Sequence, residues 1–131
     1  MPTICIRTGL FAAVLFSALF SSGCGKNDPK QLMHKAEKDV EEFLDAWSRG
    51  EPPDKFAGSD HPIQGTDPDW KEGRRLLSFL CSGTKLSEEM PDHVRCRVAL
   101  FLQDKKGEKL DKQVVYDVHL GPKSVISRAS P

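Results

Sequence analysis

Residues 93–103 read HVRCRVALFLQ, and the spacing of the apolar side chains in this stretch decides the fold. Every second position is apolar: Val94, Cys96, Val98, Leu100 and Leu102. Successive side chains of a β-strand point to opposite faces of a sheet, so this period of two predicts a strand with one buried face. The rest of the chain must therefore supply neighbouring strands and a layer that covers the apolar face.

The same period of two occurs on both sides of this stretch, around Cys81 and around Tyr116. Turn-forming residues at 88–92 and 104–107 separate the three runs, which predicts strands at about 74–86, 93–103 and 110–120. Three strands joined in succession by short turns form an antiparallel meander. Gly121-Pro122 interrupts the third strand, and residues 124–128 are expected to continue it at an edge.

An amphipathic helix is predicted at about residues 29–49. Its apolar positions recur in steps of three and four, which places them on one face of a helix: Met33, Ala36, Val40, Phe43, Leu44 and Trp47. Asp28 suits the N-cap, Pro29 suits the first helical position, and Gly50 suits the end. Residues 50–73 show neither period and are rich in Pro, Asp and Gly, so they predict a loop, with a shorter strand inside it as an alternative.

These elements predict an α+β domain with one N-terminal helix packed on a curved antiparallel sheet of three to four strands. The helix end, residues 43–51 (FLDAWSRGE), resembles the first-helix segment of NTF2-like proteins, and the order of elements is similar to the cystatin-like arrangement. The resemblance covers about residues 32–128 in outline. Steroid isomerases of the NTF2-like fold use an aspartate and a tyrosine. Here Tyr116 is expected on the core face and Asp117 on the other, so no catalytic residue carries over.

Residues 1–23 have the three-part pattern of a secretory signal peptide, with Arg7, then an apolar run over 10–20, then small residues. That run is shorter than the roughly 20 residues that a spanning helix needs. Ser21-Ser22-Gly23-Cys24 resembles the lipobox of bacterial lipoproteins, although Ser21 stands where leucine is usual. The resemblance implies cleavage between Gly23 and Cys24, and lipid attached to the Cys24 sulfur and to the new amino terminus.

The predicted mature chain is therefore an exported protein, lipid-anchored to a bacterial membrane on its periplasmic or outer face. Residues 24–28 form the lipidated cysteine and a short tether, and residues 29–131 form the domain. Two or more acyl chains make such an anchor stable. Simple secretion after cleavage and an uncleaved membrane anchor are the alternatives.

Composition excludes some partners. The chain has 19 Lys and Arg against 19 Asp and Glu, and Arg7 is the one charged residue in 1–23, so the remainder carries a net charge of −1. No basic excess exists to attract nucleic acid. The expected partners are the membrane, through the lipid anchor, and an unknown protein or small molecule.

Cys81 and Cys96 both fall on the apolar face of adjacent predicted strands, within a few residues of direct register. An exported domain meets an oxidising compartment, where a disulfide can form. A bridge between the two is the favoured prediction, and two buried free thiols are the alternative. A redox role is disfavoured, because neither cysteine is expected at an exposed helix N-terminus that would lower its pKa.

No catalytic motif occurs in the chain, so the predicted function is a non-enzymatic binding or interaction domain of an envelope lipoprotein. The alternative is a small NTF2-like enzyme or ligand carrier with a pocket between helix and sheet, for which the candidate residues are His61, Asp69, Trp70 and His119. Asp60, His61, Asp67 and Asp69 lack the ordered spacing of a calcium or zinc site, and Asp is an ordinary turn former. No metal or cofactor is therefore expected.

Overall fold

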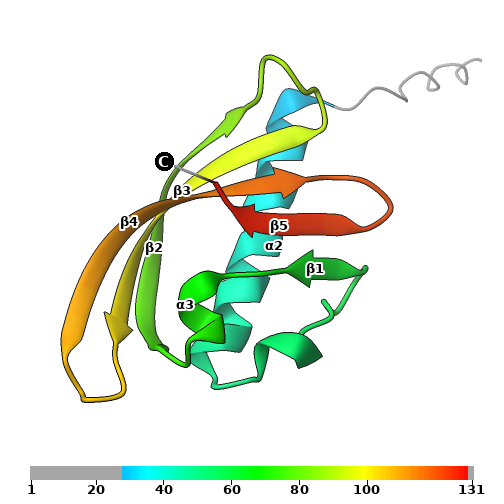
Figure 1. Ribbon diagram of the computed structural model, residues 1–131. Helices are drawn as coiled ribbons and strands as arrows, with labels where there is room; N and C mark the ends of the chain where they lie inside the picture. The colour runs from blue at the N-terminus through cyan, green and yellow to red at the C-terminus, as the bar shows by residue number, and fades with distance from the viewer. Residues whose placement is uncertain (1–27, 130–131) are drawn as a thin grey trace, which may run out of the picture.

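A computed structural model describes residues 28–129 of the chain (Figure 1). The predictions for the signal peptide, for cleavage after Gly23 and for lipid on Cys24 lie outside these residues. In chain order the elements are α2 (Pro29–Ser48), the 3₁₀ helix η2 (Pro53–Lys55), β1 (Ile63–Gly65), α3 (Pro68–Lys71), β2 (Arg75–Leu86), β3 (His93–Gln103), β4 (Lys109–His119) and β5 (Ser124–Arg128).

The sheet has five strands in the order β1-β5-β4-β3-β2. The predicted meander is confirmed, since β2, β3 and β4 pair antiparallel in succession. The expected count of three to four strands is wrong, because β1 adds a fifth strand that pairs parallel with β5 and makes the sheet mixed. For the same reason β5 lies inside the sheet and not at its edge.

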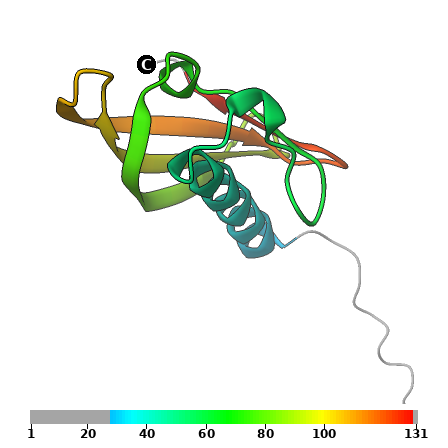
Figure 2. The same cartoon turned by 90° about the horizontal axis from the view of Figure 1, so that it is seen from below.

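The long helix α2 packs on one face of the sheet. α2 lies across β2 and β3 and also contacts β1 and β4 (Figures 1 and 2). The helix begins as predicted, with Asp28 Oδ1 accepting a hydrogen bond from the backbone N–H of Lys30 at 3.2 Å. The predicted apolar face of α2 supplies core residues Ala36, Val40, Phe43, Leu44 and Trp47, each at most 2% exposed. The opposite face of the sheet carries no described helix.

Phe43 is the centre of the core. Its ring makes edge contacts with Phe56, Trp70 and Tyr116, with ring centroids 5.4, 5.2 and 5.9 Å away. A Cβ on Gly65 would lie 2.3 Å from a ring carbon of Phe43, well inside van der Waals contact. The close approach of β1 to α2 therefore requires glycine at position 65.

The residues predicted as a loop contain structure that holds the end of α2. Trp70 of α3 stacks on Trp47, with ring centroids 5.7 Å apart. The indole N–H of Trp47 donates to the carbonyl of Arg74 at 2.8 Å, and that of Trp70 donates to the carbonyl of Glu51 at 2.9 Å. Both large apolar rings thus bury their area without leaving a donor unpaired.

Candidate functional site

The four predicted pocket residues do not form one pocket. Asp69 and Trp70 lie together on α3, and His61 lies in the loop before β1. His119 is on the uncovered face of the sheet, at the end of β4. Asp69 contacts Lys112, which is seven residues from His119 along β4, a separation of about 23 Å at the rise of a strand. The structure therefore divides these residues among three surroundings.

The first surrounding is a pair of buried aspartates, Asp67 and Asp69. Asp69 was among the candidate pocket residues predicted from the sequence, and Asp67 was not. Asp67 is the N-cap of α3, and its Oδ1 accepts from the backbone N–H of Asp69 at 2.7 Å. Its other oxygen, Oδ2, accepts from the hydroxyl of Tyr116 and from Nη2 of Arg128, the latter at 2.7 Å. Asp67 is fully buried. One carboxylate thus fixes the start of a helix and two strands of the sheet.

Asp69 is the second carboxylate of the pair and holds three cations. It contacts Arg74, accepts from Nζ of Lys112 at 3.0 and 3.1 Å, and pairs with Nη2 of Arg128 at 2.8 Å. Burial opposes its ionisation, but the hydrogen bonds from Lys112, Arg128 and Arg74 outweigh burial and hold the pKa of Asp69 below its ordinary value. Asp69 is therefore ionised at neutral pH, and the surrounding cations balance its charge.

The two aspartates hold the side chains of Tyr116 and Arg128 in place through hydrogen bonds and ion pairs. Burial, the charge of Asp67 and its hydrogen bond together raise the pKa of Tyr116 well above its ordinary value, so the phenol stays protonated. Nε of Arg128 is buried without a hydrogen-bond partner among residues 28–129, so this guanidinium depends on Asp67 and Asp69. An aspartate and a tyrosine do meet here, but Tyr116 is 0% exposed. The arrangement is suited to stability and not to proton transfer with a substrate.

His61 belongs to a second cluster with Asp39 of α2 and Ser124 of β5. Nε2 of His61 lies 3.1 and 3.2 Å from the two oxygens of Asp39 and 3.3 Å from the hydroxyl of Ser124. The Ser124 hydroxyl donates to Asp39 at 2.7 Å and is fully buried. In a nucleophilic triad the serine donates to the imidazole, whose other nitrogen faces the acid. Here one nitrogen meets both groups, so Ser124 is tied to Asp39 and not activated.

His119 lies in the third surrounding. It stacks on His93, its direct partner across β3 and β4, with ring centroids 4.4 Å apart and planes inclined by 10°. Nδ1 of His93 lies 3.3 Å from a carboxylate oxygen of Asp117. Stacked rings do not aim their nitrogens at a common point. Within residues 28–129 no group of three or more His, Cys, Asp or Glu side chains could hold a metal ion.

Cys81 and Cys96 are free thiols, so the predicted bridge is absent from the structure. The strand register explains this. Cys81 pairs with Val98 and Cys96 pairs with Thr84, so Cys96 lies two positions along β3 from the residue opposite Cys81. The two cysteines are diagonal neighbours, for which Cα separations of about 7–8 Å are usual, longer than a disulfide spans well.

Neither thiol is poised for redox chemistry. Burial raises the pKa of Cys81 to about 11, with smaller contributions from Glu41 and Glu37. Burial also raises the pKa of Cys96 to about 12, with a smaller contribution from Cys81. The thiolate is the reactive form of cysteine, and it is scarce at neutral pH for both residues. Both side chains act as small apolar groups of the core.

Comparisons with protein-family models, with curated proteins and with solved structures found no match to this chain. Among the helices of residues 28–129, none is long and apolar enough to cross a bilayer. Functional argument must therefore come from the side chains themselves.

Proposed function

We propose that this chain is a lipoprotein of the bacterial envelope whose α+β domain binds a ligand or partner and does not catalyse a reaction. The observation that carries the second half is the filled space between α2 and the sheet. Phe43, Leu44, Val98 and Tyr116 in this layer are each 0% exposed. A pocket-containing enzyme or carrier of the NTF2-like type would need an accessible cavity there, with polar groups aimed into it.

The reactive side chains of the described domain support the same proposal. Asp69 is neutralised by three cations, Ser124 donates to Asp39, and both described cysteines have raised pKa values. A general base or a nucleophile needs access to substrate and a pKa suited to its task. Asp69 and Ser124 lack access to a substrate, and the two cysteines lack a suitable pKa, so binding must use the outer surface of the domain.

The first half of the proposal rests on the lipobox-like residues and is tested by labelling. Cells expressing the full chain are grown with a radioactive or alkyne-tagged fatty acid, and the purified chain is examined for the label. We expect label on the wild type, none on Cys24→Ala, and undiminished label on the matched control Cys81→Ala. An unlabelled wild type would remove the lipoprotein assignment, and a labelled Cys24→Ala chain would remove Cys24 as the acylated residue.

A further inference from the structure

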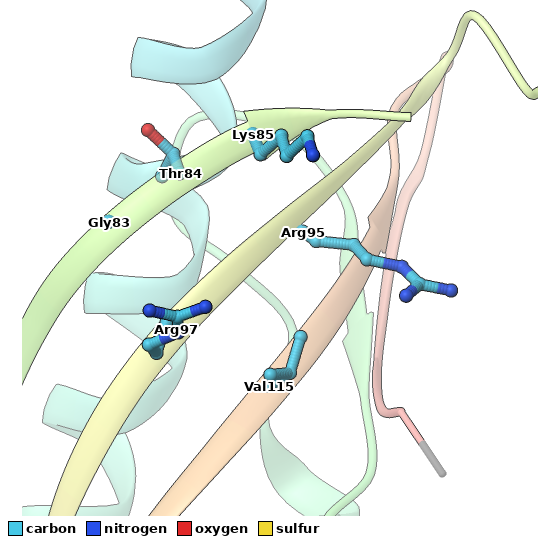
Figure 3. A pocket seen from close by; sticks show the side chains of 6 residues that line it. All are labelled: Gly83, Thr84, Lys85, Arg95, Arg97 and Val115. Carbon is cyan, nitrogen blue, oxygen red and sulfur yellow. The ribbon is translucent and has the colours of Figure 1, made fainter. Parts of the chain in front are cut away.

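An open hollow of about 360 Å³ lies where β2, β3 and β4 adjoin, toward the end of the sheet nearest the β2–β3 turn (Figure 3). Its lining contains three cationic side chains and no acidic one: Gly83, Thr84, Lys85, Arg95, Arg97 and Val115. Direct register pairs place Gly83 opposite Arg97 and Lys85 opposite Arg95. The cations therefore project from neighbouring strands on the face of the sheet that α2 does not cover.

None of these three cations has an acidic partner. Within residues 28–129, the side chains of Lys85, Arg95 and Arg97 form neither an ion pair nor a hydrogen bond. Asp117, the register partner of Arg95 on β4, is engaged with His93. Glu88 and Glu89 line an adjoining hollow with Lys85 and Arg95 but form no ion pair with them, so the three cations are free to pair with a ligand.

The backbone of β2 creates the space. The bulge between Cys81 and Gly83 interrupts the ladder, and Gly83 follows it on the same face as Arg97. A Cβ built on Gly83 meets nothing within 4 Å, and its φ is not among the positive values that favour glycine. The backbone would accept a side chain here, so the lack of one keeps the hollow open between the cations.

The spacing of the cations suits one compact anion. The Cα atoms of Arg95 and Arg97 are about 6.6 Å apart on one strand, and that of Lys85 lies about 5 Å across the ladder from Arg95, so these long side chains can reach one anion from the extended positions that Figure 3 shows. A tetrahedral phosphate offers oxygens in several directions and up to two charges, so donors can reach it from three sides. A carboxylate offers two oxygens in one plane and a single charge. The geometry favours phosphate.

We propose that this hollow binds a phosphate group, with the two guanidinium groups of Arg95 and Arg97 as hydrogen-bond donors and Lys85 as the third positive charge. The inference rests on the proposed function, because it names the ligand class of a binding domain. The phosphate belongs either to a soluble phosphate compound or to a lipid headgroup, and both present the same oxygens to the site.

The test is a titration of the full chain, in a neutral detergent, with pyrophosphate, followed by calorimetry and by ³¹P NMR. We expect saturable binding that weakens as salt is raised, because exposed charges are screened. Arg97→Gln removes a charged donor and should weaken binding at least about tenfold. Gly83→Val keeps all three cations but fills the hollow, and it should weaken binding similarly. Lys109→Gln removes an equal charge at the far end of β4 and should leave binding unchanged.

A second arm replaces pyrophosphate with soluble dihexanoyl phosphatidylglycerol, and with dihexanoyl phosphatidylcholine as its neutral counterpart. Binding of pyrophosphate alone identifies a soluble phosphate compound as the source. Binding of phosphatidylglycerol that Arg97→Gln and Gly83→Val both weaken identifies a headgroup. Absence of saturable binding in both arms, or equal loss in Lys109→Gln, overturns the site. The NMR spectrum separates the two proposals, since release of orthophosphate would contradict a non-enzymatic domain while leaving the binding site intact.

Discussion

Asparagine in place of Asp67 removes one charge from the buried acidic pair and keeps the shape of the side chain. The amide can still cap α3, because Asn is as good an N-cap as Asp. With its single oxygen on the cap, the amide turns its NH₂ group toward the Tyr116 hydroxyl and Nη2 of Arg128, where Oδ2 of Asp67 had accepted hydrogen bonds from both. What changes is the environment of Arg128, whose Nη2 lies 2.7 Å from Asp67 and 2.8 Å from Asp69. After the substitution this guanidinium has one carboxylate where it had two.

The magnitude follows from burial. Removing one member of a buried ion pair costs about 3–5 kcal/mol, because the other charge stays buried without compensation. Asp67 is 0% exposed and Arg128 retains Asp69, so the lower end applies, about 3 kcal/mol. For a domain of this size each kcal/mol lowers the melting temperature by about 4–8 °C. The expected fall is therefore about 12 °C or more.

Urea unfolding measures this loss through the fluorescence of the stacked Trp47 and Trp70, which are buried in the folded domain. The matched control is Glu72→Gln. Glu72 also pairs with a cation, Arg74 at 2.8 Å, but its side chain is 63% exposed, and exposed pairs contribute about 0–1 kcal/mol. If Asp67→Asn loses less than about 1 kcal/mol, or no more than the control, the buried pair does not stabilise the fold in the way argued.

Two further predictions concern the core and the same acidic pair. Gly65→Ala should lower the free energy of unfolding in urea by about 1–3 kcal/mol, because the new Cβ overlaps the buried ring of Phe43. The control Gly83→Ala places its Cβ in open space and should change the free energy of unfolding by less than about 0.5 kcal/mol. Similar losses in the two variants would refute the close approach at position 65. The pKa of Asp69 is lower folded than unfolded, so its contribution is present above its unfolded pKa, about 3.9, and is lost as pH falls through the folded value. The stability gap between wild type and Asp69→Asn should therefore be largest near pH 7 and shrink below pH 4; a gap constant with pH would contradict the lowered pKa.

Periodicity predicted the long elements because their buried faces are long. β3 was predicted at residues 93–103 and the structure gives His93–Gln103. The predicted third strand, 110–120, is offset by one residue from Lys109–His119. Each run contains several alternations, so an error of one residue at an end does not alter the pattern. α2 is equally clear, since its apolar stripe continues over about four turns.

Short elements carried no comparable signal. β1 has three residues and α3 has four, too few to show a period of either kind. The acidic pair was harder still, because its contacts join residues far apart in the chain: 49 positions separate Tyr116 from Asp67, and 61 separate Arg128 from it. The sequence did place Tyr116 on the core face. The sequence did not indicate that Asp67, in a predicted loop, would be buried against Tyr116.

Register was the step at which the cysteine prediction failed. Alternation placed Cys81 and Cys96 on one face, but a turn centred near Met90 leaves them out of direct register, and the structure pairs Cys81 with Val98 and Cys96 with Thr84. The bulge between Cys81 and Gly83 has its consequence at the hollow, since Gly83 follows it and lies opposite Arg97.

Net charge could not indicate the hollow, because a total does not show how individual charges are paired. Asp69 forms ion pairs with three cations, Arg74, Lys112 and Arg128. A hollow whose lining has no carboxylate contains three others, Lys85, Arg95 and Arg97. Cations kept only for solubility are usually interspersed with acids, and the exposed side of α2 has that pattern, with lysines and glutamates in close succession over residues 35–42. Placing three like charges together without a partner costs repulsion. A bound anion would offset this electrostatic repulsion. Solubility alone would not require three cations to lie together.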